Sequence, residues 1–117
     1  MNKADFNFNK WNTILGWFAF AVALITYTLT VEPTMSFWDC GEFIATAHKL
    51  EVGHPPGAPF FLMLARVFIL FAGDDISKIP IMVNILSALM SAFTILFLFW
   101  TITALAKKLV LKKAAEL

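Results

Sequence analysis

The sequence has little that would let it fold in water. Of its 117 residues, 60% are hydrophobic and only 15% are charged, whereas soluble domains have roughly 45–50% apolar and about 25% charged residues. A chain of this length cannot bury so much apolar surface in a core of its own. The composition therefore excludes an ordinary soluble domain and predicts a protein that spans a membrane.

Cysteine, proline and glycine are also scarce. The lone Cys40 excludes a disulfide bond within the chain, and glycines and prolines cluster in residues 53–59. His48 and His54, taken with the acidic residues near them, do not follow the spacing of zinc ligands, so no metal site or other cofactor is predicted. The formal net charge of +1 gives no reason to expect a nucleic-acid partner.

Charged residues are absent from two long apolar segments. Residues 11–31 and residues 81–106 are each long enough to cross the roughly 30 Å hydrocarbon layer as a helix. The first is too long for the hydrophobic region of a signal peptide, so both are predicted to be transmembrane helices. The second contains Asn84 near one end and a row of small side chains at helical spacing, which favours close contact with another helix. These small residues are Ser87, Ala88, Ser91 and Ala92.

Two shorter helices are predicted between the spans. Residues 37–50 follow Ser36, the expected N-cap, and carry one apolar face. That face consists of Phe37, Cys40, Phe43, Ile44 and Ala47. Residues 59–72 are apolar but short for a span, and they contain Arg66, whose charge would be costly at the bilayer centre. We predict a re-entrant or interfacial helix there, with a tilted span as the alternative.

The distribution of charge predicts the orientation in the membrane. Residues 1–10 and 107–117 are net basic, whereas the connecting residues 32–80 are net acidic. Because the cytoplasmic flanks of membrane helices are enriched in Lys and Arg, both tails are expected in the cytoplasm. In a bacterium, residues 32–80 would then be periplasmic and the chain would be a multi-pass protein of the inner membrane. We therefore divide it into two cytoplasmic tails and a membrane region, residues 11–106.

Acidic side chains cluster within this external segment. On the predicted helix, Asp39 and Glu42 are three residues apart and therefore share one face. Their aromatic neighbours Phe37, Trp38 and Phe43 would raise the pKa of the carboxyl groups by desolvation. The alternative is that the charges only keep an interfacial helix hydrated and that Asp39 caps it.

A rigid turn, GHPPGAP, follows this helix. Pro55 and Pro56 each fix a φ angle and favour extended geometry in the residue before them, while Gly53 and Gly57 allow the chain to bend. The turn is expected to hold the imidazole of His54 at the membrane surface, where it either takes part in binding or only bonds to the loop backbone. Polar groups in this position suit a polar ligand such as a lipid-linked phosphate with its sugar.

The stretch SFWDCGEFIATAHKLEVGHPPGAPFFLMLARVF, residues 36–68, carries a family resemblance. It resembles the N-terminal signature of a bacterial membrane protein family, common in Bacteroidota and formerly of unknown function, that is related to transmembrane protein O-mannosyltransferases. The order of helix, acidic loop, His-Pro-Pro and helix is also similar to the protein O-mannosyltransferases of the GT-C glycosyltransferase superfamily. The match runs from about Tyr27 to Thr103. It implies the N-terminal part of an all-α, GT-C-like membrane fold.

The resemblance also implies roles for individual residues. In GT-C enzymes an aspartate in the first external loop acts as base or orients the acceptor, and Asp39 occupies that position. A Glu directly follows the aspartate in the mannosyltransferases, whereas Cys40 follows it here, so that Glu42 is the second catalytic candidate. His54 matches the His-Pro-Pro element near the lipid phosphate. The further candidates for substrate binding are Trp38, Pro55, Pro56 and, by its charge, Arg66.

The implied function is the transfer of a sugar from a polyprenyl phosphate to Ser or Thr of exported proteins. Its partners would be membrane lipids, the lipid-linked sugar as co-substrate, the acceptor protein and further membrane helices, because two spans can hardly enclose such a donor. The alternative is a non-catalytic two-helix subunit that packs within a larger translocation or secretion complex. A transporter fragment is disfavoured because neither span contains a charged residue.

Overall fold

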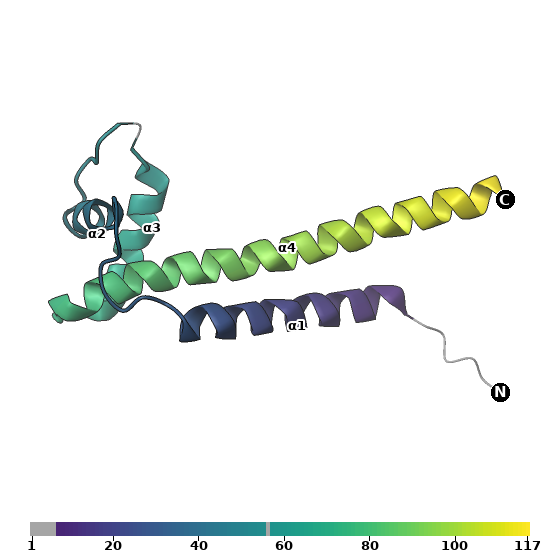
Figure 1. Cartoon of the computed structure of the whole chain (residues 1–117), viewed down its shortest axis with the longest axis horizontal. Helices are drawn as coiled ribbons and strands as arrows, with labels where there is room; N and C mark the ends of the chain where they lie inside the picture. The colour runs from purple at the N-terminus through teal and green to yellow at the C-terminus, as the bar shows by residue number, and fades with distance from the viewer. Residues whose placement is uncertain (1–6, 56) are drawn as a thin grey trace. The chain divides into compact units, whose positions relative to one another are not determined.

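The computed structural model describes residues 7–55 and 57–117, and this part of the chain is helical without any strand. The helices are α1 (Phe8–Leu29), α2 (Cys40–Lys49), α3 (Pro59–Ile69) and α4 (Ile79–Glu116), with the short 3₁₀ turns η1 (Leu70–Ala72) and η2 (Ile76–Lys78) (Figure 1). By length and composition, α1 and α4 can cross a membrane. The predicted all-α class with two candidate spans is therefore confirmed.

The apolar pattern predicted the bounds of α3 well, but it did not predict where α4 ends. The predicted helix 59–72 is α3 followed by η1, and Pro59 stands in its first turn, where its missing N–H costs nothing. The second span begins with α4 at Ile79, but the helix does not stop at residue 106. It continues through the basic residues to Glu116, because Ala, Leu, Lys and Glu all favour helix.

The beginning of α2 differs from the prediction. The helix starts at Cys40 rather than at Phe37, and Asp39 rather than Ser36 occupies the N-cap position, without a capping bond from its side chain. The cause is Trp38, whose φ of 67° is left-handed and therefore incompatible with a helix that passes through it. As a consequence Phe37 does not join the apolar face of the helix and is 95% exposed.

The chain divides into two compact units. The first contains the described residues up to Thr26 together with Ser91–Leu117, and in it α1 and α4 lie side by side and antiparallel (Figure 1). Trp17 packs edge-on against Trp100 with ring centres 6.0 Å apart. The indole N–H of Trp100 donates to the carbonyl of Asn12 at 3.2 Å. Gly16 makes this possible, since any side chain there would occupy the space of the Trp100 ring.

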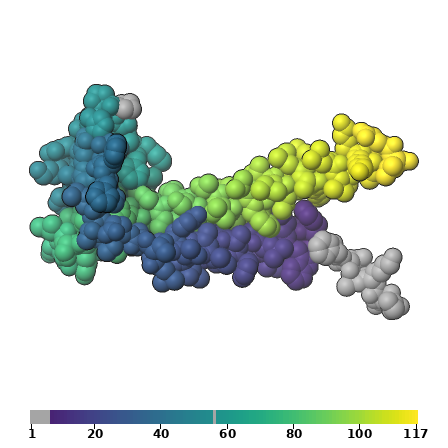
Figure 2. All heavy atoms as spheres, viewed as in Figure 1, coloured from purple at the N-terminus to yellow at the C-terminus, as the bar shows by residue number. Residues whose placement is uncertain are grey.

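Many large apolar side chains of this first unit are exposed. Figure 2 draws all its heavy atoms, with α1 in purple to blue. The large exposed side chains of α1 include Trp11, Ile14, Leu15, Phe18, Val22 and Ile25. Lipid or further helices can cover such surface in a membrane, where packing rather than water exclusion holds helices together.

The second unit, Tyr27–Met90, has a small apolar core of its own. Helix α2 packs on α3, and the buried cluster is completed by the first turns of α4. Its members are Ile44, Ala47, Leu62, Ala65, Ile69, Ala72, Ile79, Val83 and Leu86. Cys40 and Phe43 pack against it, so the predicted apolar face of α2 is confirmed apart from Phe37.

Two polar side chains fasten the connecting segments within this unit. The Nδ2 group of Asn84 donates to the carbonyls of Glu32 at 2.8 Å and Thr34 at 3.0 Å. Arg66 on α3 donates from Nη1 to the carbonyl of His48 at 2.8 Å, at the last turn of α2. These bonds hold the chain on both sides of α2, and therefore fix where its N-terminal carboxylates lie.

Candidate functional site

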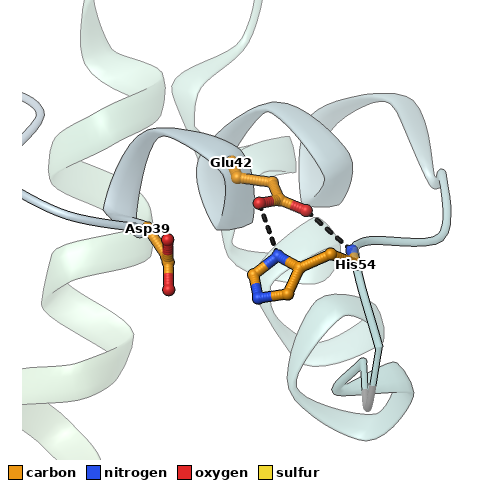
Figure 3. Close-up of side chains that lie close together, drawn as sticks. All are labelled: Asp39, Glu42 and His54. Atoms are coloured by element: carbon orange, nitrogen blue, oxygen red, sulfur yellow. Dashed lines mark hydrogen bonds and ion pairs between the residues drawn. The ribbon is translucent and has the colours of Figure 1, made fainter.

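The candidate site lies where the first turn of α2 meets the turn that follows this helix (Figure 3). Glu42 binds His54 at two points. Its Oε1 accepts the backbone N–H of His54 at 2.7 Å, and its Oε2 lies 2.6 Å from the ring Nδ1. The turn is closed on its other side by the N–H of Gly57, which donates to the carbonyl of His54 at 2.9 Å. Both the backbone and the ring of His54 are therefore held, and its role in binding stays a prediction.

The electrostatics of this pair follow from its hydrogen bonds. The N–H of His54, followed by its side chain, stabilises the ionised carboxylate and lowers the pKa of Glu42 below its usual value. In turn the hydrogen bond to Glu42, followed by the negative charge of that residue, raises the pKa of His54. The pair therefore favours a carboxylate facing an imidazolium.

The prediction that aromatic neighbours raise the carboxyl pKa is wrong for Glu42. Phe37 and Trp38 are 95% and 94% exposed, so they remove little water from the carboxylate. The direct hydrogen bonds from His54 outweigh desolvation and shift the pKa downwards.

Asp39 stands beside this pair at the start of α2 (Figure 3). One ligand atom each from Asp39, Glu42 and His54 lie within 4.8 Å of one another, which is an arrangement that could hold a cation. The spacing argument for zinc did not foresee this proximity, because it depends on the folding of the turn back onto α2. Both oxygens of Glu42 are already bonded to His54, so the site is also satisfied without an ion. That the protein works without a metal ion stays a prediction.

The structure places the other candidate residues differently. Trp38 is exposed next to Asp39, and Pro55 is exposed at the tip of the turn, whereas Pro56 lies outside the described residues. The hydrogen bonds of Arg66 go to His48 rather than to the Glu42–His54 pair. Its guanidinium has further N–H groups, so a role in phosphate binding remains a prediction.

Sequence reasoning missed how Gly53 contributes. A Cβ at this position would lie 3.2 Å from Oε1 of Glu42, so the absence of a side chain lets the carboxylate reach the backbone of the turn. The sequence indicated only that Gly53 allows the backbone of the turn to bend. A cavity of about 330 Å³ lies between the segment after α2, the turn and the start of α3, and it is lined mainly by apolar groups, among them Val52, Leu62 and Met63.

Comparison with known proteins identifies the family to which the chain belongs. Residues 39–117 match the Protein O-mannosyl-transferase TMEM260 N-terminal domain. The chain belongs to this family. The TMEM260 N-terminal domain match begins at Asp39 and includes Glu42, the turn, α3 and α4. The predicted relation to the transmembrane protein O-mannosyltransferases is therefore confirmed for the N-terminal portion.

Two curated relatives carry the TMEM260 name. The chain is 38% identical to "Protein O-mannosyl-transferase TMEM260" of Mus musculus over 87 residues, which are 74% of the chain and 12% of that protein. It is 29% identical to "Protein O-mannosyl-transferase tmem260" of Dictyostelium discoideum over 83 residues, which are 71% of the chain and 10% of that protein. The chain thus spans about a tenth of the length of these relatives. No solved structure matches it.

Proposed function

We propose that this chain is the N-terminal part of a membrane glycosyltransferase that moves a sugar from a polyprenyl-phosphate donor to Ser or Thr of exported proteins. Membership in the TMEM260 N-terminal domain family supports the reaction class, and the names of the relatives support a protein acceptor. The observation that carries the proposal is the position of Asp39, at the start of α2 and beside the Glu42–His54 pair.

In this proposal Asp39 is the general base. It accepts the proton of the acceptor hydroxyl while the hydroxyl oxygen forms a bond to the anomeric carbon of the sugar. The bond between that carbon and the phosphate oxygen breaks, and the polyprenyl phosphate leaves with the electron pair. An in-line attack inverts the anomeric centre. General-base assistance contributes roughly 10²- to 10⁴-fold, and electrostatic stabilisation of the leaving phosphate contributes further.

Other candidate residues have roles in substrate binding in this proposal. His54 and the neighbouring Pro55 shape the site near the phosphate, and Trp38 offers an exposed aromatic surface to the substrate. The reaction needs no metal in this scheme, because the phosphate leaves as an anion.

We place the site on the periplasmic side of a bacterial inner membrane, with both tails in the cytoplasm. Within the first unit, Lys107 of α4 lies 4.9 Å above the ring of Phe8, the first residue of α1. The beginning of α1 and the lysine-rich end of α4 are therefore on the same side, as a hairpin of two spans requires. Further membrane helices would enclose the donor.

A second candidate is a non-catalytic subunit that packs within a larger membrane complex. The observation in its favour is the extensive uncovered apolar surface of α1. Such a subunit would need the surfaces of α1 and α4, but it would not need the ionisable side chain of Asp39.

One substitution separates the two candidates. Asp39→Asn in the full-length gene keeps the size of the side chain and removes the base, so we expect glycosylation of exported proteins to fall by about 10²-fold or more. Asp74→Asn is the matched control, because Asp74 is an exposed acid between η1 and η2 rather than a site residue. Undiminished glycosylation by Asp39→Asn at normal protein level would show that Asp39 is not the base.

A further inference from the structure

Both carboxylate oxygens of Glu42 form hydrogen bonds with the same residue, His54. One oxygen accepts the backbone N–H of His54 and the other faces the ring Nδ1, at 2.7 Å and 2.6 Å. A single bond would leave the ring to rotate about its side-chain torsions. Two bonds, one to the backbone and one to the ring, fix the turn and the ring orientation together.

The surrounding turn is built for this double contact. Gly53 leaves the space into which Oε1 of Glu42 reaches, since a Cβ there would be only 3.2 Å from that oxygen. On the far side, the N–H of Gly57 bonds to the carbonyl of His54, and Pro55 limits the backbone between them. His54 is consequently held by bonds to its N–H, its carbonyl and its ring, although its side chain is half exposed.

The contact with Glu42 also determines which ring nitrogen of His54 can bond to a ligand. Nδ1 faces a carboxylate that can only accept, so Nδ1 carries a proton. The second nitrogen, Nε2, is not bonded to Glu42 and lies on the side of the ring toward Asp39 (Figure 3). Among the described residues, the titratable groups that act on the imidazole are Glu42 and Asp39, both at the N-terminal end of α2. Both are acidic and favour a second proton on Nε2.

We propose that Glu42 is a positioning residue that acts through His54, holding the imidazolium so that its Nε2–H donates to the phosphate of the lipid-linked sugar beside Asp39. The inference rests on the proposed function, and it separates the roles of the two carboxylates. Glu42 is balanced by the imidazolium, whereas Asp39 remains the carboxylate that takes the acceptor proton. A hydrogen bond from a cation to a phosphate oxygen strengthens as the carbon–oxygen bond breaks and negative charge collects on the phosphate.

The first test measures the pair itself, in this chain held in lipid nanodiscs. The chain contains two histidines, so ¹⁵N-histidine NMR with His48→Gln for assignment resolves His54. We expect a proton on Nδ1 in the parent chain and a pKa above the ordinary value. Glu42→Gln keeps the shape and removes the charge, so His54 should titrate at a lower pH. Glu51→Gln removes the charge of an exposed acid in the same segment and should leave the titration unchanged.

The second test measures the consequence for transfer in the full-length protein. An imidazolium is required, so activity falls as pH rises through the pKa of His54. Glu42→Gln lowers that pKa, and the alkaline limb of the profile should move to lower pH. Glu42→Asp, which keeps the charge, should restore part of the shift. Asp39→Asn should instead lower transfer by about 10²-fold or more at every pH.

The results separate the inference from the proposed function. If Glu42→Gln leaves the His54 titration where it was, or lowers transfer equally at every pH, Glu42 does not act through His54 and the inference is overturned. Transfer by Asp39→Asn, together with an NMR titration that responds to Glu42→Gln, would have a different meaning. It would show that Glu42 does hold His54, but that the proposed function and the contact with the phosphate are wrong.

Discussion

Trp38 has the least favourable backbone conformation beside the candidate site. Its φ of 67° costs a non-glycine residue about 1–2 kcal/mol, and burial does not offset this cost because the side chain is 94% exposed. Such strain tends to persist where it serves a function. Here it precedes the start of α2 at Cys40, which places the indole next to Asp39.

A pair of glycine substitutions distinguishes strain that serves the site from strain that only caps a helix. Trp38→Gly and Leu50→Gly both remove a side chain from a left-handed residue, and each should stabilise the fold by about 0.5–1 kcal/mol after the entropic cost of glycine. Unfolding by denaturant measures this effect. Only Trp38→Gly should also raise the KM for the lipid-linked sugar.

Leu50 is the control because it is the C-cap of α2 and lies outside the Asp39–Glu42–His54 group. Equal KM values for the two variants would mean that the indole of Trp38 does not contact the substrate.

The sequence predicted which residues meet at the site better than it predicted their chemistry. The three-residue spacing of Asp39 and Glu42 and the proline-rich turn were sufficient to bring these acids and His54 under consideration together. The contact between Glu42 and His54 spans 12 residues and depends on the turn folding back, which no helical periodicity encodes. The pKa direction was wrong for the same reason, since hydrogen bonding rather than aromatic burial dominates at Glu42.

At the scale of elements, α3 was predictable and α2 only in part. An apolar run with a proline at its first position defines α3 whatever surrounds it. The start of α2 depends on the backbone of Trp38, and its end on Leu50 in the left-handed region, with an N–H bond to the carbonyl of Thr46. Single-residue backbone states of this kind are set by the fold rather than by composition.

The segment that enters α2 depends on Asn84. Its amide donates to two carbonyls, those of Glu32 and Thr34. Asn84→Asp has nearly the same shape but replaces the two N–H donors with an acceptor, so the carbonyls lose their partner and face a negative charge. We expect a loss of about 1–3 kcal/mol in the free energy of unfolding. Chemical denaturation in detergent measures this change.

The control for this change is Asn9→Asp, which introduces the same acid near the N-terminus of α1, where the helix dipole favours it. This variant should be neutral or slightly stabilising. Equal stability of the two variants would contradict the role of Asn84 as an anchor.

At the scale of the whole molecule, the two apolar runs predicted both candidate spans, but they did not predict the length of the second. Helix α4 has 38 residues, which correspond to about 57 Å, nearly twice the roughly 30 Å hydrocarbon layer. The sequence marks where charge begins, at Lys107, but charge alone does not end a helix made of good helix formers. The predicted basic tail is therefore helical.

The orientation of the chain can be tested with single cysteines. In a Cys40→Ser background, Glu51→Cys should react with a membrane-impermeant maleimide in intact cells, and Ala115→Cys should react only after permeabilisation. The physical reason is the excess of lysine on the tails and of acid in residues 32–80. The opposite labelling pattern would place Asp39 in the cytoplasm, where a donor presented on the external face cannot reach it.

The contact between Gly16 and Trp100 has a consequence for the order of events during synthesis. The indole that bonds to the carbonyl of Asn12 comes 88 residues later in the chain. The first span must therefore enter the bilayer while the place above Gly16 is still vacant, and it acquires its partner only when the ribosome has completed the second span. Until then the notch at Gly16 lacks the indole that fills it in the paired helices.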